Sequence, residues 1–304
     1  MYETSQPQSQ PQPQSQPQPQ SLSQPQPQPQ PQSLSLATLI SRVRERKPLV
    51  HHITNYVTVN DCANITLAIG ASPVMADAED EAADIAAIAQ SVVLNMGTLN
   101  ERTITSMAVA GKAANLSGVP VVFDPVGAGA SKLRNDTAAK LTGEIKLSVI
   151  RGNISEIRFI AGLQSETKGV DASTSDLADT ESGGRIASEL AFKLGCVVVI
   201  SGAIDIISDG KNTIYIENGT PMLGNLTGTG CMCSSLIGSF CGAVKEVEYL
   251  AAAAGAMLCM GVAGELAFEK AGKYGSGSFH TALLDAVSLM NEETLEKFGR
   301  YNGV

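Results

Sequence analysis

Blocks of apolar residues alternate with blocks of mixed polarity along most of the chain, and their spacing predicts a regular succession of strands and helices. Short runs rich in Val, Leu and Ile predict buried strands at 49–53, 92–96, 119–123, 147–150 and 197–201. Longer segments with helical spacing lie between them, for example at 79–90, 101–115 and 182–194. Such alternation is typical of right-handed crossovers, so we predict an α/β fold whose mainly parallel sheet is covered on both faces.

The pattern differs at two other places in the chain. Apolar residues at helical spacing over 36–43, followed by Pro48, predict a short amphipathic helix at the start of the folded domain. Two apolar runs at 204–208 and 213–217 flank the turn signal Asp209-Gly210. They predict an antiparallel hairpin at one edge of the sheet.

The apolar segment 249–264 is rich in Ala and Gly and contains no charged residue. It is shorter than the roughly 20 residues needed to cross a bilayer, and Glu246, Glu248 and Glu265 flank it closely. We therefore predict a buried helix and no membrane span. Its small residues would allow close packing against a neighbouring helix or subunit.

Residues 5–33 consist only of Gln, Pro and Ser, apart from Leu22. This composition cannot bury enough apolar surface to offset the entropy of ordering, so we expect residues 1–35 to form a disordered tail. A proline-directed docking segment is the alternative. The tail contains no Lys, Arg or apolar run, which argues against a secretory signal or transit peptide and favours a cytoplasmic location.

The composition and charge of the chain argue against some classes of protein. A chain of 304 residues that is 43% hydrophobic can bury a large core, and its net charge of −9 argues against a nucleic-acid partner. The six cysteines have no spacing typical of a disulfide framework or a zinc site, so a reducing compartment is the simpler assumption.

Polar and glycine residues follow each predicted strand. These segments are Thr54-Asn55-Tyr56, Gly97-Thr98, Asp124 to Gly129, Arg151 to Glu156, and Ser201-Gly202. Because open α/β sheets bind ligands at the carboxyl ends of their strands, this repetition predicts a site at that edge.

The segment 226–231, Leu-Thr-Gly-Thr-Gly-Cys, leads into a predicted helix at 232–244. The first amides of a helix lack intrahelical acceptors and favour an anion, while Gly228 and Gly230 allow close approach of a ligand. Cys231 in the first turn would have a lowered thiol pKa. The spacing fits neither the P-loop nor the dinucleotide fingerprint, and a flexible turn beside a buried cysteine is the alternative.

Two acidic residues could hold Mg²⁺. Asp124 and Glu156 are the candidates, because Mg²⁺ is commonly bound by one or two carboxylates with waters and phosphates. Alternatively, Asp124 caps a turn and Glu156 is a solvated residue in the first turn of a helix. Arg151 could bind phosphate oxygens or form a surface ion pair. Met75 is most simply a core or pocket-lining residue.

The adjacent residues His51 and His52 lie on a predicted strand. They would therefore point to opposite faces of the sheet, which excludes joint metal ligation without distortion. We expect one of them to face the core as a neutral side chain.

Several of these segments resemble the hydroxyethylthiazole kinases of thiamine salvage, a family of the ribokinase-like group. The matching segments are LVHHITNYV (49–57), ASPVMA (71–76), LNMGT (94–98), FDPVGAG (123–129), IRGN (150–153) with Glu156, and TGTGC (227–231). The resemblance runs in order from about residue 36 to 290 and includes GSGSF at 275–279. It implies that residues 36–304 form one ribokinase-like domain with three α/β/α layers.

The resemblance also implies a reaction and an assembly. ATP would phosphorylate the primary alcohol of 4-methyl-5-(2-hydroxyethyl)thiazole with Mg²⁺ as cofactor, in a homotrimer whose substrate sites lie between subunits. Carried over residue by residue, it assigns catalysis to Cys231, thiazole contact to Met75 and Gly228, ATP contact to Arg151 and Ser201, and metal and phosphate contact to Asp124 and Glu156. Two positions depart from the family pattern: Ser201 replaces the usual threonine, and His52 replaces a frequent cysteine.

Two rival interpretations remain. A kinase of the same fold could act on a pyrimidine or pyridoxine alcohol, although Cys231 and the segment 72–75 argue against it. A non-catalytic relative could bind thiazole or nucleotide as a regulator. The presence of Asp124, Glu156 and Cys231 argues against a loss of chemistry.

Overall fold

A nine-stranded sheet in the order β2-β1-β3-β4-β5-β6-β7-β8-β9 organises the protein. The computed structural model describes residues 1–3, 35–163 and 180–303. The strands are β1 (Leu49–Ile53), β2 (Ser72–Val74), β3 (Ser91–Asn95), β4 (Val121–Asp124), β5 (Val149–Asn153), β6 (Val197–Ser201), β7 (Asp205–Ser208), β8 (Thr213–Ile216) and β9 (Tyr301–Asn302). Pairings from β2 to β6 are parallel, and those from β6 to β9 are antiparallel. The predicted, mainly parallel sheet is therefore confirmed.

The predicted tail, residues 1–35, lies almost entirely outside the described residues. The described residues from Ser35 onward belong to one compact unit.

Successive residues of the central strands face two separate hydrophobic cores. Val121 and Phe123 of β4 belong to one core, and Val122 belongs to the other. Adjacent strand residues point to opposite faces of a sheet, so apolar residues are required at every position when both faces are covered. This requirement explains the continuous Val, Leu and Ile runs in the sequence.

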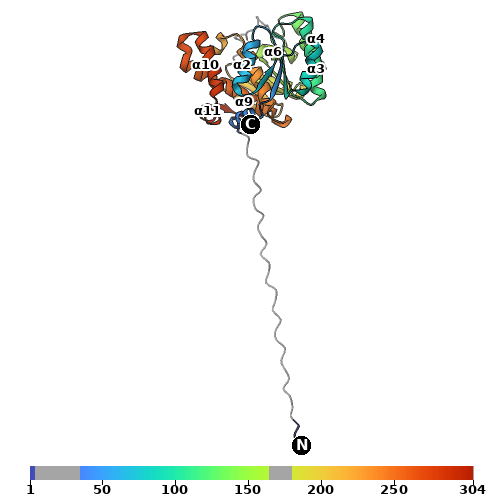
Figure 1. Ribbon diagram of the computed structural model, residues 1–304, viewed down its shortest axis with the longest axis vertical. Helices are drawn as coiled ribbons and strands as arrows, with labels where there is room; N and C mark the ends of the chain where they lie inside the picture. The colour runs from blue at the N-terminus through green and yellow to red at the C-terminus, as the bar shows by residue number, and fades with distance from the viewer. Residues whose placement is uncertain (4–34, 164–179, 304) are drawn as a thin grey trace. The chain divides into compact units, whose positions relative to one another are not determined.

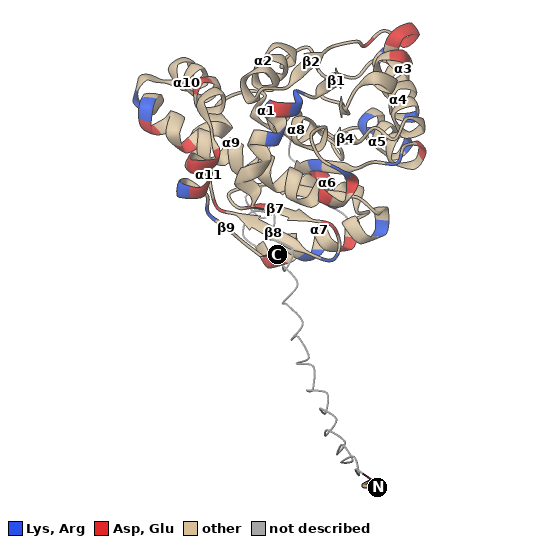
Figure 2. Cartoon of the chain, turned by 60° about the horizontal axis from the view of Figure 1, so that its bottom comes forward, with Lys and Arg blue, Asp and Glu red and all other residues tan. Residues whose placement is uncertain are grey.

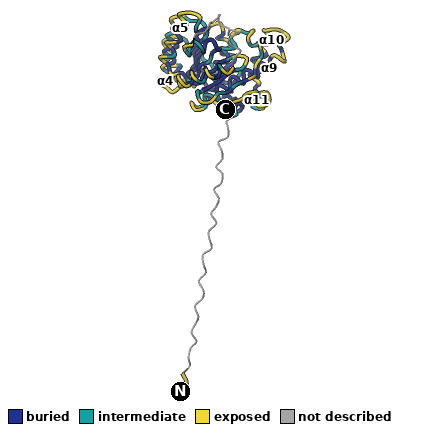
Figure 3. The backbone as a smooth tube through the Cα atoms, turned by 180° about the vertical axis from the view of Figure 1, so that it is seen from behind, coloured by how far each residue is buried: buried dark blue, intermediate teal, exposed yellow. Residues whose placement is uncertain are grey.

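Helices cover both faces of the sheet, as the ribbon and the burial of the strands show (Figures 1 and 3). One core contains residues of α1 (Leu39–Arg46), α2 (Val59–Ile69), α8 (Thr229–Cys241), α9 (Tyr249–Ala271), α10 (Ser276–Leu289) and α11 (Glu292–Phe298). The other contains residues of α3 (Glu79–Ile88), α4 (Glu101–Leu116), α5 (Lys132–Glu144), α6 (Ile154–Ile160) and α7 (Thr180–Leu194). The predicted three layers are confirmed.

Glu79, Asp80 and Glu81 begin α3, where the positive end of the helix dipole favours acidic side chains (Figure 2).

The helix α9 corrects one prediction. The helix continues past Gly264 to Ala271, and the helical segment from Glu246 to Tyr274 is long and apolar enough to cross a membrane. Contrary to the prediction, this helix is therefore not too short to span a bilayer. However, 78% of its most apolar window is buried inside the protein, which confirms the prediction of a buried helix.

The predicted hairpin is confirmed as β7 and β8, but its predicted place at the edge of the sheet is wrong because β9 pairs with β8.

The helix α8 packs directly on the sheet. A Cβ atom at Gly238 would lie 2.5 Å from Cγ2 of Val93 in β3, so only glycine allows this approach. The close packing places the start of α8 beside the carboxyl ends of the strands.

Candidate active site

A pocket of about 630 Å³ lies at the carboxyl ends of β1, β3, β4 and β5 and at the start of α8. It is lined by Asn55, Val57, Thr58, Gly97, Thr98, Asp124, Val126, Arg151, Asn153, Glu156 and residues 224–231. The structure thus brings together five of the seven predicted site residues, namely Asp124, Arg151, Glu156, Gly228 and Cys231. A pocket is therefore present at the edge of the sheet where the sequence predicts a site.

The start of α8 forms one wall of the pocket. Gly228 caps the helix with φ of 91°, a left-handed conformation that favours glycine. The first helical hydrogen bond runs from the amide of Met232 to the carbonyl of Gly228 (2.8 Å), so the amides of residues 229–231 precede it. A Cβ atom at Gly230 would lie 2.5 Å from a guanidinium nitrogen of Arg151. The glycines therefore let the helix start approach the floor of the pocket.

The Cys231 sulfur faces two asparagine side chains. Nδ2 of Asn55 and Nδ2 of Asn95 each donate a hydrogen bond to Sγ of Cys231, at 3.3 Å. Burial raises the pKa of the Cys231 thiol, and the negative charge of Asp124 raises it further. The lowered pKa predicted from the helix end is wrong, because removing the thiolate from water outweighs the contacts that favour it.

Asp124 is a fully buried carboxylate at the end of β4. Its Oδ2 accepts hydrogen bonds from Nδ2 of Asn95 and Oγ of Ser234, both at 2.8 Å. Nη1 of Arg151 lies 3.9 Å from the same oxygen. Burial raises the pKa of Asp124, while Arg151 opposes the rise. The other oxygen, Oδ1, has no hydrogen-bond partner among the described residues.

Glu156 lies in the first turn of α6 but is buried, with 4% of its surface exposed. Its carboxylate accepts hydrogen bonds from the amides of Gly127 (2.7 Å) and Asn153 (2.8 Å). Burial, followed by repulsion from Asp124, raises the pKa of Glu156 to about 7. The alternative that Glu156 is solvated is therefore wrong.

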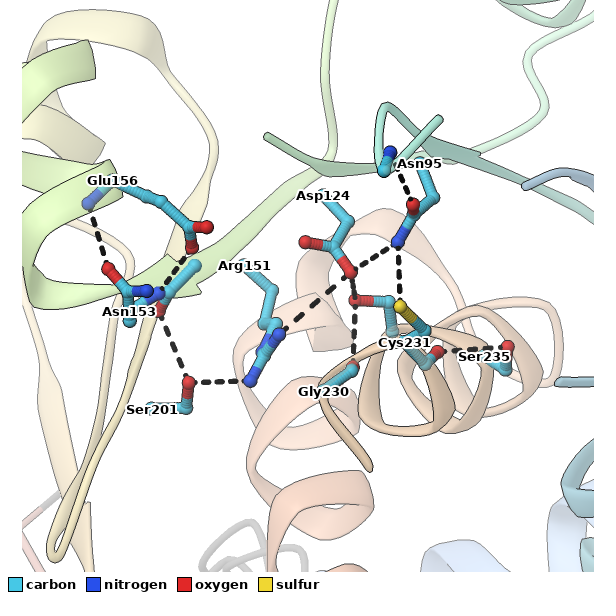
Figure 4. Close-up of polar contacts among 12 residues, drawn as sticks. Asn95, Asp124, Arg151, Asn153, Glu156, Ser201, Gly230, Cys231 and Ser235 are labelled. Atoms are coloured by element: carbon cyan, nitrogen blue, oxygen red, sulfur yellow. Dashed lines mark hydrogen bonds and ion pairs between the residues drawn. The ribbon is translucent and has the colours of Figure 1, made fainter. Parts of the chain in front are cut away.

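Arg151 connects Asp124 with Ser201. Nη2 of Arg151 donates to Oγ of Ser201 at 2.6 Å, and Figure 4 shows the guanidinium between the carboxylate and the hydroxyl. Only 12% of the Arg151 side chain is exposed, so the alternative of a surface ion pair is wrong. Ser201 joins the site through this contact.

Met75 lies one residue after β2, is half-buried, and is not among the residues that line the pocket. Both histidines of β1 are buried. Burial lowers the pKa of His51, whose Nε2 is 2.7 Å from the carbonyl of Ala76, and lowers that of His52 to about 4. Both side chains are therefore neutral at pH 7, one more than predicted.

Comparison with known proteins decides the family. The profile of the hydroxyethylthiazole kinase family matches residues 40–293. The hydroxyethylthiazole kinase of Ruminiclostridium cellulolyticum is 56% identical over 269 residues, which cover 88% of this chain and 97% of that protein. The corresponding protein of Clostridium beijerinckii is 57% identical over 266 residues, covering 87% and 96%. This chain belongs to the hydroxyethylthiazole kinase family.

Solved structures agree with this assignment. A hydroxyethylthiazole kinase protein from Pyrococcus horikoshii aligns with a TM-score of 0.80 at 37% identity, covering 88% of this chain and 98% of that chain. A ribokinase-like superfamily protein from Enterococcus faecalis aligns at 14% identity with a TM-score of 0.55, covering 86% and 92%. The second likeness shows the fold alone, which is the predicted ribokinase-like fold.

In this member of the hydroxyethylthiazole kinase family, four polar side chains contribute to the site without having been predicted from the sequence. Asn95 lies inside an apolar run and Ser234 inside a helix of small residues, while Thr58 and Arg134 lie in loop or helix segments without a motif. The contacts of Asn95, Ser234 and Arg134 reach other elements, and Thr58 contacts the nearby Asn55, so no motif in the sequence marks these four residues. Only the position of Asn95 at the end of a buried strand could have drawn attention to it.

Proposed function

We propose that this pocket transfers the γ-phosphate of ATP to the hydroxyl of 4-methyl-5-(2-hydroxyethyl)thiazole, which gives the thiazole phosphate for thiamine biosynthesis. The observation that carries the proposal is the meeting of Cys231, the amides at the start of α8, Arg151 and two buried carboxylates in one pocket. Phosphoryl transfer depends mainly on alignment and on stabilising charge at the moving group. The amides of residues 229–231 and the Arg151 guanidinium supply positive potential for that charge.

The carboxylates fit a magnesium ion. Asp124 and Glu156 line the same pocket, and burial, followed by repulsion from Asp124, raises the pKa of Glu156. Oδ1 of Asp124 lacks a hydrogen-bond partner within the described ranges. A group of three or more His, Cys, Asp or Glu residues able to hold a metal is absent from the described part of the chain. This pairing suits Mg²⁺, which takes few protein ligands and completes its shell with water and phosphate. When bound, Mg²⁺ would neutralise charge on the phosphate oxygens.

Cys231 is the residue we assign to the alcohol. In this proposal its sulfur accepts the alcohol proton or orients the hydroxyl toward the phosphate. Because burial raises its pKa, a thiolate that acts as base forms more readily as the pH rises above 7. Arg151 and Ser201 are assigned to ATP, and Gly228 is assigned to the thiazole.

Met75 is also assigned to the thiazole, although it does not line the pocket of one chain. We propose a homotrimer in which the substrate site lies between subunits, so that Met75 can contribute to a shared site. The exposed side chains of Tyr56 and Val57, 78% and 56% accessible beside the pocket, support an interface there. Sedimentation equilibrium at micromolar concentration tests this proposal, and a fully active monomer would contradict it.

We also propose a cytoplasmic location, because all six cysteines are free thiols.

The decisive test of function is ATP consumption by the purified protein with thiazole, pyrimidine and pyridoxine alcohols in parallel. We expect the highest kcat/KM with the thiazole alcohol. Preference for a pyrimidine or pyridoxine alcohol would identify a different kinase of this fold. Binding of the thiazole without ATP consumption would instead indicate a regulator.

A further inference from the structure

We propose that Asn55 and Asn95 are positioning residues that hold the Cys231 sulfur as a hydrogen-bond acceptor, and that Asn95 ties it to Asp124. The inference deepens the proposed kinase function and rests on it for its catalytic consequence. Both asparagines are buried, with 4% and 3% of their surfaces exposed, and both follow or end strands at the pocket.

The orientation of both amides is fixed by their partners. Oδ1 of Asn55 accepts from the backbone amide of Thr58 at 3.1 Å, and Oδ1 of Asn95 accepts from the amide of Gly97 at 2.9 Å. A backbone N–H can only donate, so each of these side-chain atoms must be oxygen. The NH₂ groups of both asparagines consequently face the interior of the site.

Every hydrogen of the two NH₂ groups has an acceptor. Nδ2 of Asn55 donates to Oδ1 of Asn95 (2.9 Å) and to the Cys231 sulfur (3.3 Å). Nδ2 of Asn95 donates to the same sulfur (3.3 Å) and to Oδ2 of Asp124 (2.8 Å). Four hydrogens meet three acceptors, of which the sulfur accepts two, and this arrangement makes the network directional and rigid.

The hydrogen bonds of this network make the Cys231 sulfur an acceptor. Neither NH₂ group can accept the thiol hydrogen, so the two asparagines favour the form in which sulfur bears negative charge. Thr58 supports Asn55 through a second bond, from its Oγ1 to Oδ1 of Asn55 at 3.1 Å. Asp124 on β4 and Arg151 on β5 are ionisable groups that act on Cys231, and the thiols of Cys62 on α2 and Cys233 on α8 also interact with it electrostatically.

A purely structural role would make the asparagines ordinary buried amides. The chain offers a matched control in Asn218, which is 4% exposed. Its Nδ2 donates to Glu265 (3.0 Å) and to the carbonyl of Phe298 (2.9 Å), and it does not line the pocket. Replacing Asn218 removes an equally buried amide without touching the sulfur.

The test measures alkylation of Cys231 by iodoacetamide as a function of pH, with Cys231→Ala protein as the baseline for the other thiols. In Asn55→Ala protein we expect the alkylation midpoint to move to higher pH, so that the rate below the midpoint falls about tenfold. Asn218→Ala should leave the midpoint unchanged. Asn55→Asp keeps the size of the side chain and the acceptor for Thr58, so this variant replaces the alanine variant in the test if the latter does not fold. Its negative charge should move the alkylation midpoint to still higher pH. An unchanged midpoint in the Asn55 variants overturns the proposal.

Steady-state kinetics supply the catalytic half of the test. Asn55→Ala should lower kcat at least tenfold while KM for ATP stays within about twofold, and the loss should shrink in a Cys231→Ser background. Equal losses in both backgrounds would show that Asn55 does not act through the sulfur. If the alkylation midpoint shifts in the Asn55 variants but the wild-type protein does not phosphorylate the thiazole alcohol, the role of the asparagines is supported and the proposed function is wrong.

Discussion

At the scale of single residues, buried acids give the protein a pH dependence. Asp205, the first residue of β7, accepts a hydrogen bond from the amide of Gly202 at 3.0 Å. Burial raises its pKa to about 7, above its value in the unfolded chain. The folded state therefore holds a proton that the unfolded state releases, and the stability that this proton contributes is lost as the pH rises from about 4 through 7.

We predict that Asp205→Asn reduces this loss, because the amide keeps the acceptor for Gly202 without a charge. Each pKa unit corresponds to about 1.4 kcal/mol, so the gain in unfolding free energy at pH 8 is at most a few kcal/mol. Urea denaturation of both proteins at pH 5 and pH 8 measures it. An identical pH dependence in the two proteins would contradict the prediction.

Residue-scale features also separate what the sequence could predict from what it could not. Asp124, Arg151 and Cys231 could be found because polar residues after apolar strands, or a glycine loop before a helix, are local signals. Ser234 could not be found, because its contact with Asp124 arises only when strand and helix meet, and Asn95 had no signal except its place at the end of a buried strand. The pKa of Cys231 was predicted in the wrong direction because burial depends on the whole fold.

At the scale of elements, α5 organises the loops below the pocket. Arg134 donates to the carbonyls of Met96 (2.6 Å), Gly97 (2.7 Å) and Val126 (2.5 Å). These bonds connect the loops after β3 and β4, which carry residues that line the pocket.

We predict that Arg134→Lys lowers kcat/KM several-fold, because an ammonium group cannot reproduce the planar fork of donors. Lys132→Ala is the matched control on the same helix, since Lys132 forms an exposed ion pair with Asp136. Steady-state kinetics of the two variants test whether Arg134 positions the loops after β3 and β4. Wild-type kinetics in Arg134→Lys protein would rule out the role.

The strand and helix pattern predicted most elements because apolar spacing reflects burial on two faces. It missed β2, a three-residue strand that contains Pro73, and β9, which exists only through pairing with β8. It ended α9 too early because the polar residues after Gly264 lie on the less buried side of the same helix. Short edges and helix ends depend on tertiary contacts more than on local pattern.

At the scale of the whole molecule, the division between tail and domain stays a prediction. Residues 5–33 have no apolar anchor except Leu22, so we expect deletion of residues 1–33 to leave stability and turnover nearly unchanged. Thermal unfolding and steady-state turnover of the truncated protein measure both. A large fall in either would mean that the tail packs on the domain.

In the proposed mechanism, Cys231 accepts the alcohol proton or orients the alcohol for phosphoryl transfer. Asp at position 231 would place another proton acceptor at the start of α8, where the helix end favours negative charge. The most direct measurement is steady-state turnover of the thiazole alcohol by Cys231→Ser, Cys231→Ala and Cys231→Asp proteins, with ATP binding and folding checked. We predict that Ser and Ala lower turnover by about 10²–10⁴-fold with little change in ATP binding, while Asp retains substantial activity. Near-normal turnover in the Ser and Ala variants would contradict the account and make Cys231 a packing residue.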